Sequence, residues 1–237
     1  MAKMAAVISA ERQQFVVYGL LALSVLAATA YLGARNGALY RPFFGPLPPL
    51  LAVGITAVIG AILLALLLGR GWFAIAGAQT GRGLLTAVLL ASLFAIVIVL
   101  IDWFVVLPAD LNRPYPDALP FYYSIAFVVE VIFHLLPLTL LLLGLTALSP
   151  SLTFEPVIWP VLIVVALLEP IFQTVLGFSR PYPAWVMVLV ALNIFAFNVS
   201  GLALFKRYDF VSMFALRLAY YALWHIIWGV LRLRFLF

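Results

Sequence analysis

The stretch FVVEVIFHLLPLT, residues 127–139, carries a carboxylate and an imidazole, Glu130 and His134, inside an otherwise apolar run. Residues four apart lie on one face of an α-helix, so these two side chains can act on the same group. A carboxylate beside an imidazole is suited to general acid and base chemistry, or to metal binding. The same spacing recurs farther along the chain, in Glu169 and Gln173 and in Arg217, Tyr221 and His225.

The composition of the chain indicates the environment in which these residues lie. Hydrophobic residues make up 67% of the 237 and charged residues only 9%, and the mean hydropathy is +1.24. An ordinary soluble domain is about half apolar and about a quarter charged, so this chain belongs in a bilayer. The net charge of +5 comes from basic residues scattered through short loops, which is typical of membrane topology and not of a nucleic-acid surface. The chain has no cysteine, which excludes disulfides, thiolate metal sites and cysteine nucleophiles.

Seven long apolar runs predict the fold. About 20 apolar residues are needed to span the hydrocarbon core as a helix, so the pattern predicts an all-α, polytopic transmembrane bundle. No loop is long enough for a separate soluble domain, and residues 1–237 are therefore expected to form one domain. We expect the first run to be retained as a spanning helix and not cleaved as a signal peptide. The runs cover approximately residues 14–33, 49–69, 83–108, 120–148, 156–179, 183–205 and 210–231.

Ionisable side chains inside these runs are expected to face the interior of the bundle. A charge at mid-bilayer costs about 2.5 to 3.5 kcal/mol on insertion scales, so such groups turn away from lipid and find partners. We expect Arg217 to pair with Glu130, with Glu169 as the rival partner, and we expect Tyr221 to fill the space beside them. The predicted buried polar cluster consists of Glu130, His134, Glu169, Gln173, Asn193, Arg217, Tyr221 and His225.

The span VEVIFHL, which begins at Val129, resembles a known motif. It is similar to the EExxxR motif of the CPBP family, the CAAX-protease and bacteriocin-processing intramembrane proteins, with Glu130 at the second glutamate and His134 at the arginine. In that family, paired glutamates and two histidines bind a metal or activate the water that cleaves a peptide bond within the membrane. The resemblance therefore implies a helical membrane fold with a site built around Glu130.

The segment LFKRYDFVSMFALRLAYYALWH resembles the closing segment of the same family. There, an arginine-rich turn leads into a helix that bears HxxxN or HxxxD, often with another histidine one turn later. Arg217 matches the first histidine, Tyr221 the Asn or Asp, and His225 the trailing histidine. The resemblance covers about residues 70–230, and the two runs within residues 1–69 precede it.

The matched positions depart from the family in the residues that carry the chemistry. Val129 stands at the first glutamate, His134 at the arginine and Arg217 at a histidine, and the fifth run lacks the histidine of the family's FxxxH motif. A guanidinium stays protonated and has no lone pair to offer, so Arg217 can serve neither as a metal ligand nor as a general base. We therefore expect no catalytic residue and no metal at these positions.

These departures predict a catalytically degenerate, CPBP-like integral membrane protein that acts as an accessory or structural subunit, or a binding partner, in a membrane protein complex. Its expected partners are membrane lipids and other integral membrane proteins of a hetero-complex, and its expected location is a bacterial cytoplasmic membrane. We expect it to bind no nucleic acid and no cofactor. Two alternatives stay open. An active CAAX-type peptidase would use Glu130 with His134 or His225 in an altered arrangement. A haem or a chlorophyll-type pigment would be held by His134 and His225, the only two histidines of the chain.

Two further expectations concern positions outside the polar cluster. Asp102, near the end of the third run, is expected to be a carboxylate at the membrane interface. The small residues of AVGITAVIGA, 52–61, are typical of faces at which helices approach closely in lipid. Gly54 and Gly60 are therefore expected to lie on an outer face that binds a partner helix.

Overall fold

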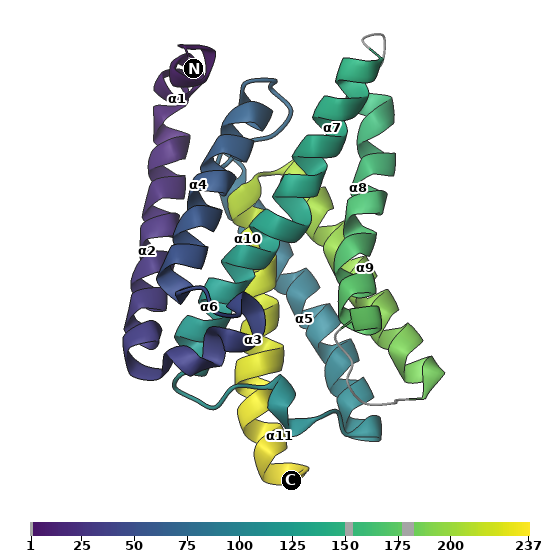
Figure 1. Ribbon diagram of the computed structural model, residues 1–237. Helices are drawn as coiled ribbons and strands as arrows, with labels where there is room; N and C mark the ends of the chain where they lie inside the picture. Colours follow the sequence, from purple (N-terminus) through teal and green to yellow (C-terminus); the bar gives the residue numbers. More distant parts are fainter. Residues whose placement is uncertain (1, 150–153, 177–182) are drawn as a thin grey trace.

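The protein is a bundle of α-helices in the computed structural model, which describes residues 2–149, 154–176 and 183–237 (Figure 1). Seven helices in these residues are long and apolar enough to cross a membrane, and the described chain contains no strand. The predicted all-α, multi-pass membrane fold is thus confirmed. The end of the fifth predicted run, 177–179, lies outside the described residues.

The helices follow one another with short connections. The first spanning helix is α2 (Arg12–Asn36), continued by the 3₁₀ turn η1 (Gly37–Tyr40) and α3 (Arg41–Phe44); α1 (Ala2–Ala10) precedes it. Next come α4 (Pro49–Leu68), α5 (Thr80–Val105), the short turn η2 (Ala109–Leu111), and the fourth span formed by α6 (Ala118–Val129), η3 (Glu130–Leu135) and α7 (Leu136–Leu148). The last three spans are α8 (Phe154–Ile171) with η4 (Phe172–Leu176), then α9 (Ala184–Arg207), and finally α10 (Phe210–Tyr221) with η5 (Ala222–Trp228) and α11 (Gly229–Phe235).

Helix α10 lies inside the bundle, where it packs against α5, α9 and α6 (Figure 1). Its start is fixed by Asp209, whose carboxylate accepts hydrogen bonds from the backbone nitrogen and the hydroxyl of Ser212 (2.8 and 2.7 Å) and from the Thr80 hydroxyl. Gly83 of α5 lets the two helices approach closely, because a Cβ there would lie 2.8 Å from the Cβ of Ser212. Helix α10 is therefore held at a fixed depth beside α5.

Three π-helical segments, η3, η4 and η5, interrupt the fourth, fifth and seventh spans. Proline explains two of them, because it lacks an N–H and its ring clashes with the carbonyl four residues earlier. Pro137 is the second residue of α7, just after η3, and Pro170 lies two residues before η4 begins. Single π turns inside α-helices are rare and are frequently found at functional sites. The three segments therefore single out the middle of these spans for closer description.

The outer surface of the bundle is apolar, as lipid requires. Along α5 the exposed side chains include Leu85, Leu89, Ile96 and Phe104, whereas the alanines at 87 and 91 are buried. The inner face of such a helix contacts the protein core and its outer face contacts lipid. Both faces are therefore hydrophobic, and amphipathic patterning is weak.

Gly60 of α4 faces the interior, which contradicts the outer binding face predicted for it, whereas Gly54 is only partly buried. Gly60 is buried, and a Cβ on it would overlap the hydroxyl of Tyr18 and lie 3.1 Å from Val131 Cγ2. That hydroxyl donates a hydrogen bond to the carbonyl of Ala57 (2.7 Å), so the ring cannot simply swing away. The small residues serve a close contact between α4 and α2 inside this chain, because helix approach in lipid favours small residues whether the neighbour belongs to the same protein or to another.

Replacing Gly60 with alanine is expected to lower the free energy of unfolding by about 1 to 3 kcal/mol, the usual cost of overpacking a well-filled interior. The added methyl group has to displace the Tyr18 hydroxyl and break its hydrogen bond to Ala57. Gly54→Ala is the matched control, because the nearest atom to its added Cβ is a Leu26 methyl at 3.9 Å. Thermal unfolding in detergent measures both variants, and equal melting temperatures would contradict the packing described here.

Candidate functional site

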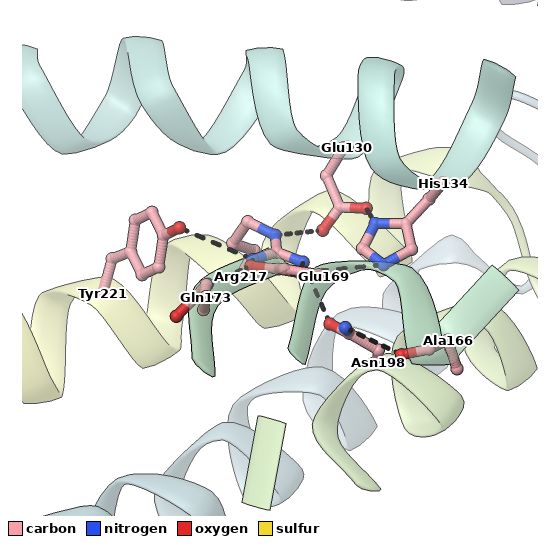
Figure 2. A network of polar contacts seen from close by, with 8 residues as sticks. All are labelled: Glu130, His134, Ala166, Glu169, Gln173, Asn198, Arg217 and Tyr221. Carbon is pink, nitrogen blue, oxygen red and sulfur yellow. Dashed lines mark hydrogen bonds and ion pairs between the residues drawn. The ribbon is translucent and has the colours of Figure 1, made fainter. Parts of the chain in front are cut away.

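Four ionisable side chains from three spans meet in the middle of the bundle (Figure 2). They are Glu130 and His134 of η3, Glu169 of α8 and Arg217 of α10, and each is only 2% exposed. Arg217 and His134 each contact both carboxylates, so that basic and acidic side chains alternate around the group. We call these four residues the charge ring.

Arg217 is the most fully bonded member of the charge ring. Its Nε donates to Glu130 Oε1 (2.5 Å), and its Nη1 and Nη2 donate to the two carboxylate oxygens of Glu169 (3.0 and 2.9 Å). Nη2 also donates to Asn198 Oδ1 (3.2 Å), and Nη1 also donates to the hydroxyl of Tyr221 (3.5 Å). The guanidinium therefore pairs with both predicted partners at once, because its planar fork can serve two carboxylates in different directions.

His134 closes the ring on the other side. Its Nδ1 lies 2.8 Å from Glu130 Oε2 and its Nε2 lies 3.8 Å from Glu169 Oε2. Within the described residues these contacts lack the geometry of hydrogen bonds, so both ring nitrogens and Glu130 Oε2 are buried without a hydrogen-bond partner. The imidazole therefore lies between two carboxylates at short range without a hydrogen bond to either.

Asn198 connects the charge ring to a proline. Pro170 has no N–H to donate to the carbonyl of Ala166, four residues earlier in α8. Asn198 Nδ2 donates to that carbonyl (3.3 Å), while its Oδ1 accepts from Arg217 (Figure 2). One amide thus satisfies a backbone acceptor that Pro170 frees and also orients the guanidinium.

Asn193, predicted in the cluster, lies outside it. The residue is buried, but its Nδ2 has no hydrogen-bond partner within the described chain. Asn193 and Asn198 are five residues apart, which is about 140° around an α-helix, so both cannot face Arg217. The structure selects Asn198, and the prediction of Asn193 was wrong in this respect.

His225 also lies apart from the charge ring, although it follows Arg217 and Tyr221 at intervals of four. It falls in η5, where the wider π turn changes the direction in which successive residues point. Its ring stacks on that of Tyr122 at 4.3 Å between centroids, and its Nδ1 lies 3.5 Å from the Asn112 amide nitrogen. His225 nevertheless meets the ring of Tyr221 at 5.0 Å between centroids and lines the same pocket as Arg217 and Tyr221, so the predicted stripe holds although its last member makes no contact with the charge ring.

The other predicted positions line the edge of the ring. Gln173 Nε2 donates to Glu169 Oε1 (2.8 Å), and the Tyr221 hydroxyl accepts from Arg217. Val129, at the position matched to a glutamate, is half-buried and packs against the hydrophobic core. It contributes no polar atom to the site.

A pocket of about 120 Å³ borders the charge ring, where the sequence predicted that Tyr221 would fill the space. Glu169, Gln173 and Arg217 lie on one wall, and the rest of the lining is mainly apolar and aromatic. On its other side Tyr221 lines an open apolar groove of about 500 Å³ between α2, α6 and the seventh span. The ring of Tyr221 thus separates the polar pocket from a groove that faces the membrane.

A second buried polar group surrounds Arg232 of α11, and it corrects the prediction for Asp102. Asp102 is fully buried inside the protein and not exposed at the surface, and its two oxygens accept from Arg232 Nε (2.7 Å) and Nη2 (2.8 Å). Arg232 also donates to Asn112 Oδ1 and to the carbonyls of Leu107 and Pro108. We call Asp102, Asn112, Trp228 and Arg232 the Arg232 cluster, since Trp228 Nε1 donates to Asp102 as well (2.7 Å).

Sequence reasoning missed the Arg232 cluster because Arg232 lies at the end of the last run, where a basic residue is typical of a membrane interface. A signal was present nevertheless, since Asp102 stands within an apolar run and needs a cation nearby.

A comparison with protein-family models, with curated proteins and with solved structures finds no significant match to this chain. What the protein does has therefore to be inferred from the charge ring and its surroundings.

Proposed function

We propose that the protein is a catalytically degenerate, CPBP-like membrane protein in which a structural ion-pair network occupies the place of a peptidase site. It acts as an accessory or structural subunit of a hetero-complex of integral membrane proteins. A bacterial cytoplasmic membrane is the proposed location. The single observation that carries this proposal is the position of the Arg217 guanidinium between the carboxylates of Glu130 and Glu169.

That position opposes hydrolysis by Glu130. A general base has to accept a proton from water, so one carboxylate oxygen must be free to approach it. Oε1 of Glu130 accepts from Arg217, and Oε2 is buried with His134 at 2.8 Å, so neither oxygen is open to an approaching water. Their closeness also supports the resemblance, because Glu130 and Arg217 are the positions matched to a catalytic glutamate and histidine.

The same geometry opposes a metal or a tetrapyrrole. A divalent cation beside the carboxylates would be repelled by the guanidinium that already binds both of them, and a catalytic zinc needs about three ligands. Among the described residues, no three His, Asp or Glu side chains are arranged to hold a metal ion. Both ring nitrogens of His134 face carboxylates, which leaves neither of them directed at a haem iron or a pigment.

Purified protein is expected to hold no stoichiometric zinc and to leave prenylated and transmembrane peptides uncleaved. Both expectations follow from the engagement of Glu130 and from the lack of ligands at the matched positions. Elemental analysis and a peptide-cleavage assay in detergent test them, with Glu130→Gln as the matched variant. About one zinc per chain, lost together with peptidase activity in that variant, would replace the proposal with the active-peptidase alternative.

The proposed role in a complex requires a separate test. Tagged protein, extracted from its own membrane in mild detergent, is expected to bring down at least one other integral membrane protein in stoichiometric amount, identified by mass spectrometry. The control is the same protein washed in a harsh detergent that separates subunits. Native mass spectrometry that finds the chain alone after extraction in its surrounding lipid would contradict the proposed role.

A further inference from the structure

The charges of the charge ring do not sum to zero unless a proton is added. Glu130 and Glu169 supply two negative charges and Arg217 supplies one positive charge, which leaves one negative charge in a site that is 2% exposed. An unpaired charge buried in the bilayer costs several kcal/mol, so the ring has to take up a cation or a proton.

The geometry of His134 identifies where the proton goes. Its two ring nitrogens face different carboxylates, at 2.8 Å from Glu130 and 3.8 Å from Glu169. A neutral imidazole carries a proton on one nitrogen only, so it would present a lone pair to one of the two carboxylates. An imidazolium carries a proton on both nitrogens and is attracted by both carboxylates.

Apart from the two carboxylates of the charge ring themselves, the surroundings of His134 offer no rival for this role. The helices that pack on η3 are α4, α6, α7 and α8. Helices α4 and α7 contain no ionisable side chain, α6 contributes only tyrosines, and α8 contributes Glu169 beside the ring. Helix α10 contributes the remaining two groups near His134. They are the guanidinium of Arg217, which lies between the carboxylates, and the hydroxyl of Tyr221, which that guanidinium contacts.

We propose that the charge ring is a proton-binding site, in which one proton on His134 makes the ring neutral and holds the fourth, fifth and seventh spans together. The pocket of about 120 Å³ beside Glu169 and Arg217 has room for about four water molecules, at roughly 30 Å³ each, on the side of the charge ring away from His134's own contacts. This inference is independent of the proposed function, because it concerns the charge of the ring and not the fate of a peptide.

The chain contains only two histidines, so nitrogen NMR of protein labelled with ¹⁵N-histidine can observe the site directly. His225→Gln, which changes a residue outside the charge ring, leaves His134 as the single labelled imidazole. At about pH 8, where an ordinary histidine is neutral, its two nitrogens are expected to show the shifts of an imidazolium. A neutral imidazole at that pH would overturn the proposal.

Glu169→Gln is the matched variant, because it removes one negative charge and changes little in shape. The charge ring is then neutral without the extra proton, so His134 is expected to become neutral at about pH 8. A bound metal cation could supply the positive charge in place of the proton. Exchange of sodium for potassium or for a bulky organic cation in the buffer tests this alternative. A shift of melting temperature with the kind of cation, together with a neutral His134, would assign the ring to a metal cation instead.

Discussion

Replacing Arg217 with methionine is expected to lower the free energy of unfolding by about 3 to 5 kcal/mol, the usual cost of removing one partner from a buried ion pair. Glu130 and Glu169 would remain buried with a single cationic group, His134, between them. The variant also leaves Asn198 Oδ1 without its donor. Thermal unfolding in detergent at alkaline pH, where the carboxylates do not escape by taking up protons, measures the loss.

The matched control removes the carboxylates' charges together with the guanidinium. Arg217→Met combined with Glu130→Gln and Glu169→Gln buries no net charge, and it is expected to regain a large part of the lost stability, because replacing a whole buried ion group is often neutral. Arg217→Lys should recover less, since an ammonium group cannot form the paired bonds to Glu169. If Arg217→Met alone unfolded at the same temperature as the wild type, the charge ring would not be a structural lock.

Length and hydropathy were sufficient to predict the fold. Each span needs about 20 apolar residues, and proline and glycine mark the connections, so the seven runs could be read directly. The pairing of Arg217 with Glu130 or Glu169 could be predicted as well, because a membrane leaves few places for an ionisable group except beside one of opposite charge.

The direction of each side chain was harder to predict. A period of 3.6 residues placed His225 on the face of Arg217, and it does line the same pocket, but its polar partner is Asn112 and not the charge ring. The choice between Asn193 and Asn198 depends on the carbonyl that Pro170 frees in a neighbouring helix, which is a tertiary relation. Gly60 shows a third limit, since small residues indicate a close helix contact without telling whether the neighbour lies in the same chain.

The Asp102→Asn variant is expected to lower the free energy of unfolding by about 3 to 5 kcal/mol, a loss comparable to that of Arg217→Met. The guanidinium of Arg232 would be left buried with only neutral acceptors, those of Asn112, Leu107 and Pro108. In contrast to the charge ring, this cluster lies where α5 ends and the connection to α6 begins, so the damage should appear first in that connection.

Backbone geometry gives the reason why the connection depends on Asp102. Val106 ends α5 with a φ of 52°, a left-handed conformation that is an outlier for a β-branched residue and costs about 1 to 3 kcal/mol. It persists because Asp102 accepts from the backbone nitrogen of Leu107 (2.8 Å) while Arg232 holds the carbonyl of the same residue. In Asp102→Asn, amide hydrogen exchange of residues 106–112 should therefore accelerate more than that of the spanning helices.

The double variant Asp102→Asn with Arg232→Met separates the contribution of the ion pair from that of the bonds to the backbone. If the pair acts as a unit, the double variant loses less stability than the sum of the two single losses, by about 0.5 to 3 kcal/mol. Strictly additive losses would mean that Arg232 and Asp102 stabilise the connection independently, through their separate bonds to the backbone.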